Sequence, residues 1–373
     1  MISNINKAVL LISIVLYACT LQASTDKPYK IDSRIIIQKG LSQSRITSII
    51  EDERGFMWFG TADGLNRYDG YSFKIFRNIP NDSTSLPNNN INSMVEDKQG
   101  NIWIGTNNGI AVFNPYTEVF KSLKDNDSSK TTKGGNFITS CAIDKQNNIW
   151  YIIKGYGIYK INSATLEKEQ LKINTNDSLL FKHINKLFVD KSNRLWIGSY
   201  ISNSVLTYNI NNKSFDKYPL YGVIQKENQK LMITTFYEDD KDRIWLGLID
   251  YDGLDGSLFF LDKGQKTFKN YNQFLSTNDI DILNHRINTI QSITSHNDEI
   301  WFASLLGGIF KFKFGEVPIG YYKQSPNKDV SILCLHKSKN GLLWIGTNGT
   351  GIEISAPNNT DFKLMSNTID YNF

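Results

Sequence analysis

The chain has 373 residues and carries 41 Lys and Arg against 37 Asp and Glu. This length can form one large domain or two average ones, and no Lys/Arg run is dense enough to suggest a nucleic-acid-binding surface. The 26 Gly greatly outnumber the 8 Pro, which favours a turn-rich β protein over a helical one. We therefore expect a β protein with a large core and no direct nucleic acid binding.

Residues 1–23 have the layout of a secretory signal peptide. A single cation precedes an apolar run, Ala8–Ala18, which is too short for a comfortable membrane span and is followed by small residues. We expect cleavage after Ala23, export to the periplasm, and a membrane tether only if the chain is part of a longer one. Two alternatives stay open, namely a lipoprotein attached at Cys19 and an uncleaved anchor.

Two cysteines, Cys141 and Cys334, would remain after cleavage. They are too few for a disulfide framework and lack metal-ligand spacing, so we interpret them as two buried thiols. The four histidines show no paired spacing for zinc. The acidic stretch Asp125–Ser129 lacks the Gly and the final Glu of a calcium-binding EF-hand loop. We predict neither a metal nor a cofactor.

All the tryptophans stand in one recurring local context, 43 to 56 residues apart. A period of this size without a helical pattern predicts a ring or stack of small sheets. Seven such units account for residues 46–373, so we predict an all-β, seven-bladed propeller of four-stranded antiparallel blades. The blades are marked by Trp58, Trp103, Trp150, Trp196, Trp245, Trp301 and Trp344.

Each repeat can be divided into the same parts. A period-two apolar alternation predicts a first strand about twelve residues before the Trp, as at Ile46–Ile49. In the last two repeats it starts fourteen residues before, at Ile287–Ile290 and Val330–Leu333. The Trp opens a second strand, and a Gly two residues later allows a close neighbour. The N-terminal segment, 24–45, contains a further strand (Arg34–Lys39) that could close the ring.

An Asp stands six residues before the Trp in five repeats. We interpret these residues as turn formers that accept backbone N–H bonds. Sialidase-type propellers place an Asp five residues before the Trp, and this chain offers no arginine triad or catalytic carboxylate pair. The repeated acids therefore predict hairpins rather than catalysis. They are Asp52, Asp97, Asp144, Asp190 and Asp239.

The stretch GLSQSRITSIIEDERGFMWFGTADGLNRYDGYSFKIFRN (Gly40–Asn78) closely resembles the opening of the periplasmic sensors of hybrid two-component systems. Those sensors are built from two-component regulator propeller repeats. The pattern I-x-x-I-x-x-D-x-x-G-x-[IL]-W-[IF]-G-T-x-x-G-[LI] is clear at Trp58, Trp103 and Trp344 and degenerate at the other four tryptophans. The resemblance implies a ligand-sensing propeller, corresponding to the first propeller of such a sensor.

The resemblance also implies partners. Members of the family sense glycans, commonly oligosaccharides, and switch on genes for their use. Their first propeller is usually followed by a second propeller, an immunoglobulin-like domain, a membrane helix, a histidine kinase and a receiver. This chain contains no kinase or receiver motif, so we expect phosphorelay to reside outside it. Whether Phe373 is the natural end, and whether the chain forms a homodimer, stay open.

In such a propeller the residues before each first strand and the turns after each Trp share one mouth of the central channel. Polar and aromatic side chains at these positions suit a sugar, whose apolar faces stack on rings while its hydroxyls form hydrogen bonds. The alternative is that they are ordinary solvated turn residues. The candidate ligand-binding residues are Arg45, Asp63, Asn90, Asn107, Tyr156, His183, Tyr200, Tyr251 and Arg286.

Two other functions stay open. The propeller could be a scaffold that only binds protein, or a polysaccharide lyase or hydrolase. A lyase would need a His and a carboxylate together, and the only candidates to test are His183 and Arg286. We expect a non-enzymatic sensor.

Overall fold

The repeated sequence unit folds into a small antiparallel sheet. In the first repeat the strands are β2 (Ile46–Glu51), β3 (Met57–Thr61), β4 (Gly64–Tyr68) and β5 (Phe73–Phe76). Trp58 stands in the second strand, opposite Ile50 on one side and Arg67 on the other. The computed structural model describes residues 33–35, 40–123, 136–172, 183–201, 204–221, 231–250, 256–271, 289–296, 298–305, 308–316, 319–322 and 331–355.

The later repeats follow the same order of strands. The second and third sheets contain β6 (Ile91–Glu96), β7 (Ile102–Thr106), β8 (Gly109–Asn114), β9 (Val119–Ser122), β10 (Ile138–Ile143), β11 (Asn148–Ile153), β12 (Gly157–Asn162) and β13 (Lys168–Gln170). The fourth repeat contains β14 (Lys186–Val189), β15 (Arg194–Gly198), β16 (Tyr200–Ile201), β17 (Ser204–Asn209) and β18 (Ser214–Tyr221).

The last three repeats complete the set. The fifth contains β19 (Leu231–Glu238), β20 (Ile244–Asp250), β21 (Gly256–Leu261) and β22 (Phe268–Asn270). The sixth contains β23 (Ile290–His296), β24 (Glu299–Ser304), β25 (Gly308–Lys313) and β26 (Ile319–Tyr322). The seventh contains β27 (Ile332–Lys337), β28 (Leu343–Thr347) and β29 (Ile352–Ser355), joined by β1 (Ser33–Ile35) from the N-terminal segment.

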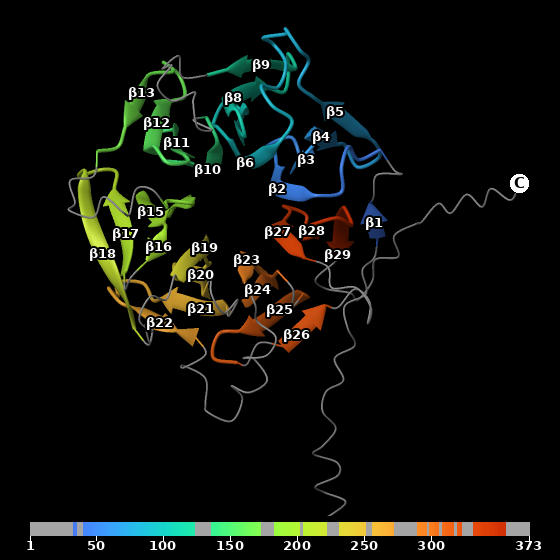
Figure 1. The fold of residues 1–373 in the computed structure, drawn as a ribbon. Helices are drawn as coiled ribbons and strands as arrows, with labels where there is room; N and C mark the ends of the chain where they lie inside the picture. The colour runs from blue at the N-terminus through green and yellow to red at the C-terminus, as the bar shows by residue number, and fades with distance from the viewer. Residues whose placement is uncertain are drawn as a thin grey trace, which may run out of the picture. The chain divides into compact units, whose positions relative to one another are not determined.

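The sheets are arranged as a ring within the unit that runs from residue 31 to 373 (Figure 1). The first strands contact one another in the order β2, β6, β10, β14, β19, β23, β27 and back to β2. The fourth and fifth repeats share one nine-stranded sheet, because β18 pairs in parallel with β22 and β16 pairs with β19. The structure is an all-β propeller, and its inner ring fits the predicted seven blades.

The N-terminal and C-terminal parts of the described chain meet in one sheet. β1 is its outermost strand and pairs antiparallel with β29, with Ser33 opposite Ile354 and Ile35 opposite Ile352. β1 begins one residue before the predicted segment Arg34–Lys39, and residues 36–39 lie outside the described part. The predicted signal peptide also lies outside it.

Two predicted strand positions were wrong in register. β23 begins at Ile290 and β27 at Ile332, rather than at Ile287 and Val330, which lie outside the described residues. Ile290 pairs with Ser304 just as Ile46 pairs with Thr61 in the first sheet. The sequence INTIQSI contains two overlapping alternations, and the second is the one that enters the sheet.

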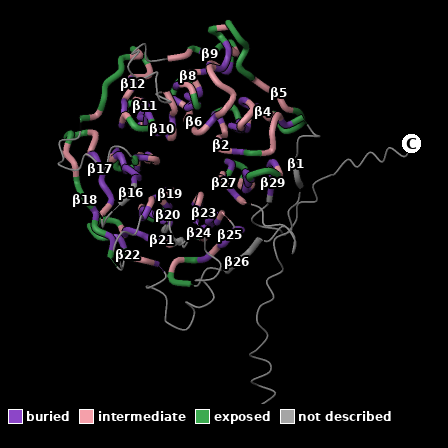
Figure 2. The backbone as a smooth tube through the Cα atoms, viewed as in Figure 1, coloured by how far each residue is buried: buried purple, intermediate pink, exposed green. Residues whose placement is uncertain are grey.

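The tryptophans pack between neighbouring blades, as predicted. Trp58 and Trp103 are fully buried, and Trp58 packs edge-on against Phe113 of the next blade at 5.5 Å between ring centroids. At the closure, Trp344 of the last blade lies 5.6 Å from Phe59 of the first. Buried residues are concentrated in the strands, whereas exposed ones lie mainly at the outer turns (Figure 2).

The glycines after the tryptophans make this close packing possible. A Cβ atom added to Gly60 would lie 2.6 Å from Ile91 Cγ2, and one added to Gly105 would lie 2.6 Å from Ile138 Cγ2. In both cases the isoleucine belongs to the first strand of the next blade. The neighbour that the sequence predicted is therefore the adjacent blade.

The repeated aspartates hold the hairpins and the tryptophans at once. Asp97 Oδ1 accepts the backbone N–H groups of Gln99 and Asn101, both at 2.9 Å, as predicted for a turn former. Its Oδ2 accepts the indole N–H of Trp103 at 2.8 Å. The same indole bond occurs in all five repeats that carry the Asp, at 2.8 to 3.0 Å. The sequence reasoning missed this bond.

Candidate functional site

Hydrogen bonds join the two predicted loop sets on one face of the ring, here called the mouth face. It consists of the residues before the first strands and the turns after the tryptophans. Within one blade, the N–H of Asn107 donates to the carbonyl of Asn90 at 3.1 Å. Between blades, the N–H of Gly64 donates to the carbonyl of Asn89 at 2.8 Å. These bonds link the turns both to the loop of their own blade and to that of the next blade.

The mouth-face residues differ in how far they are already engaged. Asp63 is paired with the guanidinium of Arg77, at 2.9 Å from Nη2, so its charge is compensated within the first blade. Asn107 Oδ1 accepts the side-chain amide of Asn92 at 2.9 Å. Asn90 is half-buried beside them. These residues form an ordered polar rim.

The other described candidates have more varied surroundings. Arg45 and His183 are exposed, and Arg45 forms an isolated backbone bridge with Asn348 of the last blade. Tyr156 is half-buried and packs on the cluster around Trp103. The backbone of Tyr200 pairs with Met232 of the next blade. Tyr251 and Arg286, with the Tyr200 side chain, lie outside the described residues.

The corrected register changes which residues line the mouth in the last two blades. The residue directly before β23 is Thr289, whose carbonyl accepts the N–H of Leu305 at 2.8 Å. In the last blade, the carbonyl of Ser331 accepts the N–H of Asn348 at 2.8 Å. Thr289 therefore occupies the position at which Arg286 was predicted.

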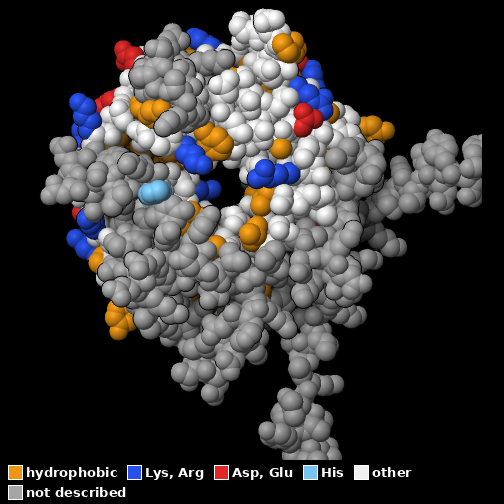
Figure 3. Space-filling model, viewed as in Figure 1, with side chains coloured by type: hydrophobic (Ala, Val, Ile, Leu, Met, Phe, Trp, Pro, Cys, Tyr) orange, Lys and Arg blue, Asp and Glu red, His pale blue; other side chains and the backbone are white. Residues whose placement is uncertain are grey.

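An open hollow passes through the centre of the ring, and Lys and Arg side chains lie around it (Figure 3). One cation of the mouth face is Lys154, whose ammonium lies 5.2 Å from the ring centre of Phe137. A second cation, Lys186, lies deeper in the inner wall, on β14. The sequence reasoning missed Lys186, although it stands ten residues before its Trp, where three other repeats carry Ser.

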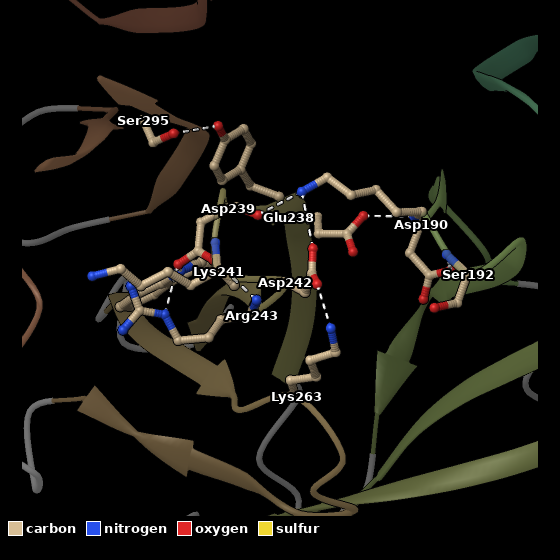
Figure 4. A network of polar contacts seen from close by, with 12 residues as sticks. Asp190, Ser192, Glu238, Asp239, Lys241, Asp242, Arg243, Lys263 and Ser295 are labelled. Atoms are coloured by element: carbon tan, nitrogen blue, oxygen red, sulfur yellow. Dashed lines mark hydrogen bonds and ion pairs between the residues drawn. The ribbon is translucent and has the colours of Figure 1, made fainter. Parts of the chain in front are cut away.

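The opposite face, which carries the Asp hairpins, contains paired charges. Between the fourth and fifth blades, Asp242 accepts bonds from Lys191 at 3.1 Å and from Lys263 at 2.7 Å (Figure 4). Glu238 accepts the backbone N–H of Lys191 at 2.6 Å, and Arg243 pairs with Asp239 at 2.7 Å. A cavity of about 670 Å³ lies beside this network. The charges of this network neutralise one another, which favours a structural role for the network.

Burial favours the neutral forms of two thiols and one histidine in the ring. Burial raises the pKa of the Cys141 and Cys334 thiols to about 12, and both cysteines are free, as predicted. Burial, with a smaller effect of Lys339, lowers the pKa of His336 to about 4. Within the described residues, no group of three His, Cys, Asp or Glu side chains could hold a metal ion.

The profile of the two-component regulator propeller family matches residues 40–63, 85–108 and 325–349. The chain carries two-component regulator propeller repeats. The three matches contain Trp58, Trp103 and Trp344, the repeats that follow the pattern most clearly, and they confirm the family resemblance. In the described part of this regulator propeller, no helix has the length and apolar character needed to cross a membrane.

Solved structures share the fold. The extracellular domain of a hybrid two-component system of B. thetaiotaomicron is 24% identical, with a TM-score of 0.66 over 88% of this chain and 42% of that one. The extracellular domain of a one-component system of the same organism is 20% identical, with a TM-score of 0.66 over 88% of this chain and 40% of that one. A streptogramin B lyase is 16% identical, with a TM-score of 0.59 over 84% of this chain and 94% of that one. The fold thus occurs in extracellular domains of two-component and one-component systems and in a lyase.

A curated relative, histidine kinase P4 of Formosa agariphila, is 57% identical over 47 residues. That match covers 13% of the regulator propeller and 3% of the kinase. The regulator propeller spans less than half the length of both extracellular domains and a small part of the kinase.

Proposed function

We propose that this regulator propeller is the extracytoplasmic ligand-sensing domain of a hybrid two-component regulator, and that its ligand is an oligosaccharide. The observation that carries the proposal is the family match in three repeats of one continuous ring. The similarity to extracellular domains of bacterial signalling systems supports a location outside the cytoplasm.

The mouth face is the proposed ligand site. Its polar rim of Asn90 and Asn107 supplies amide donors and acceptors, and Tyr156, in the turn after Trp150, supplies a half-buried ring. Amides and aromatic rings are the groups that recognise sugar hydroxyls and apolar sugar faces. The hairpin face, by contrast, has its charges paired internally.

Signalling would pass through partners outside this chain. Bound glycan would change how the propeller packs against a second propeller, an immunoglobulin-like domain or a homodimer mate. That change would reach a kinase and activate glycan-utilisation genes. The ligand supplies the free energy for such a shift only through its different affinity for the two arrangements.

Glycan-array screening followed by calorimetry on the secreted chain tests the proposal. We expect at least one oligosaccharide to bind, and Arg45→Ala and Asn107→Ala to weaken it, whereas Lys217→Ala on the exposed outer strand β18 leaves it unchanged. A glycan response in a reporter strain that is insensitive to both mouth variants would favour a protein-binding scaffold. Release of cleaved sugar that is lost in His183→Ala would favour a lyase or hydrolase instead.

A further inference from the structure

Lys186 differs in kind from the residues at the same position of the other inner strands. It pairs with Gly198, as Ser93 pairs with Gly105 and Cys334 with Gly346. Ser93 Oγ accepts the N–H of Cys141 on the next inner strand at 2.9 Å, so this position lies at the wall between neighbouring inner strands. A lysine at this position has four methylene groups between its backbone and its ammonium, so the ammonium can extend beyond the wall.

Lys186 lies on β14, one of the inner strands that surround the centre of the ring. A Cys334 thiolate would raise the pKa of Lys186, although Cys334 lies on β27 in the seventh blade and Lys186 on β14 in the fourth. β14 and β27 are not neighbours in the inner ring, since β19 and β23 stand between them. Their mutual influence therefore acts across the centre of the ring, where Figure 3 shows an open hollow.

The charge of Lys186 has no compensating carboxylate among the described residues. No ion pair or hydrogen bond of its ammonium occurs there, and the Cys334 thiol is neutral, because burial raises its pKa to about 12. The lysines of the hairpin face are different, since Lys191 and Lys263 both pair with Asp242 (Figure 4). Burial lowers the pKa of Lys186.

The described charged residues around the mouth add to the positive electrostatic potential that Lys186 creates. Arg45 and Lys154 are exposed cations, whereas the carboxylate of Asp63 is neutralised by Arg77. An uncompensated ammonium at the wall of the channel favours an anion, because charge-assisted hydrogen bonds are stronger than neutral ones. An oxyanion that enters from the mouth would meet Arg45 or Lys154 first and Lys186 within the channel.

We propose that the ligand of this propeller carries an oxyanion, a carboxylate or a sulfate ester on the oligosaccharide, and that Lys186 binds this group inside the channel. The inference rests on the proposed function and narrows its ligand to acidic glycans. A neutral oligosaccharide would leave the Lys186 ammonium without a partner and would bind more weakly.

The test compares three probes of equal length on the secreted chain by calorimetry. They are a neutral galacto-oligosaccharide, an oligogalacturonide, and a sulfated galacto-oligosaccharide. We expect at least one acidic probe to bind tenfold or more tightly than the neutral one, with an affinity that falls as salt rises. The comparison of the two acidic probes distinguishes carboxylate from sulfate.

Variants then assign the effect to Lys186. Lys186→Met keeps an apolar stem of similar length without the charge, Lys186→Arg keeps the charge, and Lys217→Met on β18 is the matched surface control. Lys186→Met should lose tenfold or more in affinity for the acidic probe, whereas the other two variants stay within about threefold. Lys186→Met should also melt higher than the parent without ligand, because it removes an uncompensated charge.

Two results would overturn the inference. Lys186→Met could bind the acidic probe as tightly as the parent, or the neutral probe could bind as tightly as the acidic ones. In the first case, a lower melting temperature of Lys186→Met would show that the charge is already compensated. If only neutral glycans bind, the proposed sensor function stands and this inference fails; if no glycan binds, both fail.

Discussion

Replacing Asp97 by Asn separates the two tasks of the repeated aspartate. The Asn Oδ1 atom can still accept the backbone N–H groups of Gln99 and Asn101, which Asp97 accepts at 2.9 Å. The amide nitrogen, however, would replace the oxygen that accepts the Trp103 indole at 2.8 Å, so that two donors face each other. The substitution therefore leaves the hairpin bonded and the indole without an acceptor.

The magnitude follows from burial. Asp97 is 3% exposed and Trp103 is fully buried, so water cannot replace the lost acceptor. Leaving a buried donor unsatisfied costs about 1–3 kcal/mol, and the bonds that remain lose their charge assistance. We expect Asp97→Asn to lower the free energy of unfolding by about 2–3 kcal/mol, and Asp97→Ala to lower it further because the hairpin bonds are lost as well.

Urea unfolding of the secreted chain, followed by tryptophan fluorescence, measures this difference. The control is Asp216→Asn at an exposed position of β18; this side chain takes no part in an Asp hairpin, and the substitution should change stability by less than about 0.5 kcal/mol. If Asp97→Asn were as stable as this control, the indole bond would contribute nothing and the reasoning would be wrong. A loss equal to that of Asp97→Ala would show that the hairpin bonds do not survive in the amide.

The last blade provides the reverse experiment. There Ser338 occupies the Asp position, and the buried indole N–H of Trp344 has no acceptor in the described part of the chain. Ser338→Asp should therefore stabilise the protein by about 1–2 kcal/mol in the same urea assay. A fall in stability would mean that this hairpin cannot hold a carboxylate. Gly105→Ala should destabilise by about 1–3 kcal/mol, because the new methyl group would meet Ile138 Cγ2 at 2.6 Å. Calorimetric melting should show a smaller penalty in an Ile138→Ala background; an equal penalty in both would place the strain elsewhere. His336 has its pKa lowered by burial from 6.5 to about 4, so the unfolded chain binds the extra proton and stability should fall by about 3 kcal/mol as pH drops from 6.5 to 4. In His336→Gln that part of the pH dependence should vanish in urea titrations at several pH values, and an unchanged slope would assign it to other groups.

The repeat and its packing could be predicted from the sequence because each blade reuses the same local solution. Trp58, Gly60 and Asp52 recur in phase, and each has a physical reason that a single repeat already suggests. The features that recur along the chain are the hairpin, the buried tryptophan ring and the close packing of the next blade against the glycine. The family resemblance at Gly40–Asn78 follows from the same residues.

The missed features depend on contacts between repeats, which no single repeat contains. The register of the sixth blade was misplaced because INTIQSI contains two overlapping alternations. The contact that distinguishes them lies in another repeat: a Cβ atom added to Gly247 of the preceding blade would lie 3.0 Å from Ile290 Cβ. The pairing of Asp63 with Arg77 requires the fourth strand to return beside the turn. Lys186 could have been noticed, since it replaces a small residue at a fixed distance from its Trp.

The pairing of β1 with β29 has a consequence for how the ring is made. The two strands are joined through the whole propeller, so their encounter carries the largest loop-closure entropy of any pair in the sheet system. If the chain is exported from its N-terminus, β1 emerges first and must wait, unpaired, until the last repeat has followed. Contacts between such distant segments form slowly, and a waiting strand edge can pair with a wrong partner. We expect folding to be limited by this final step, with six blades assembled before the seventh is complete.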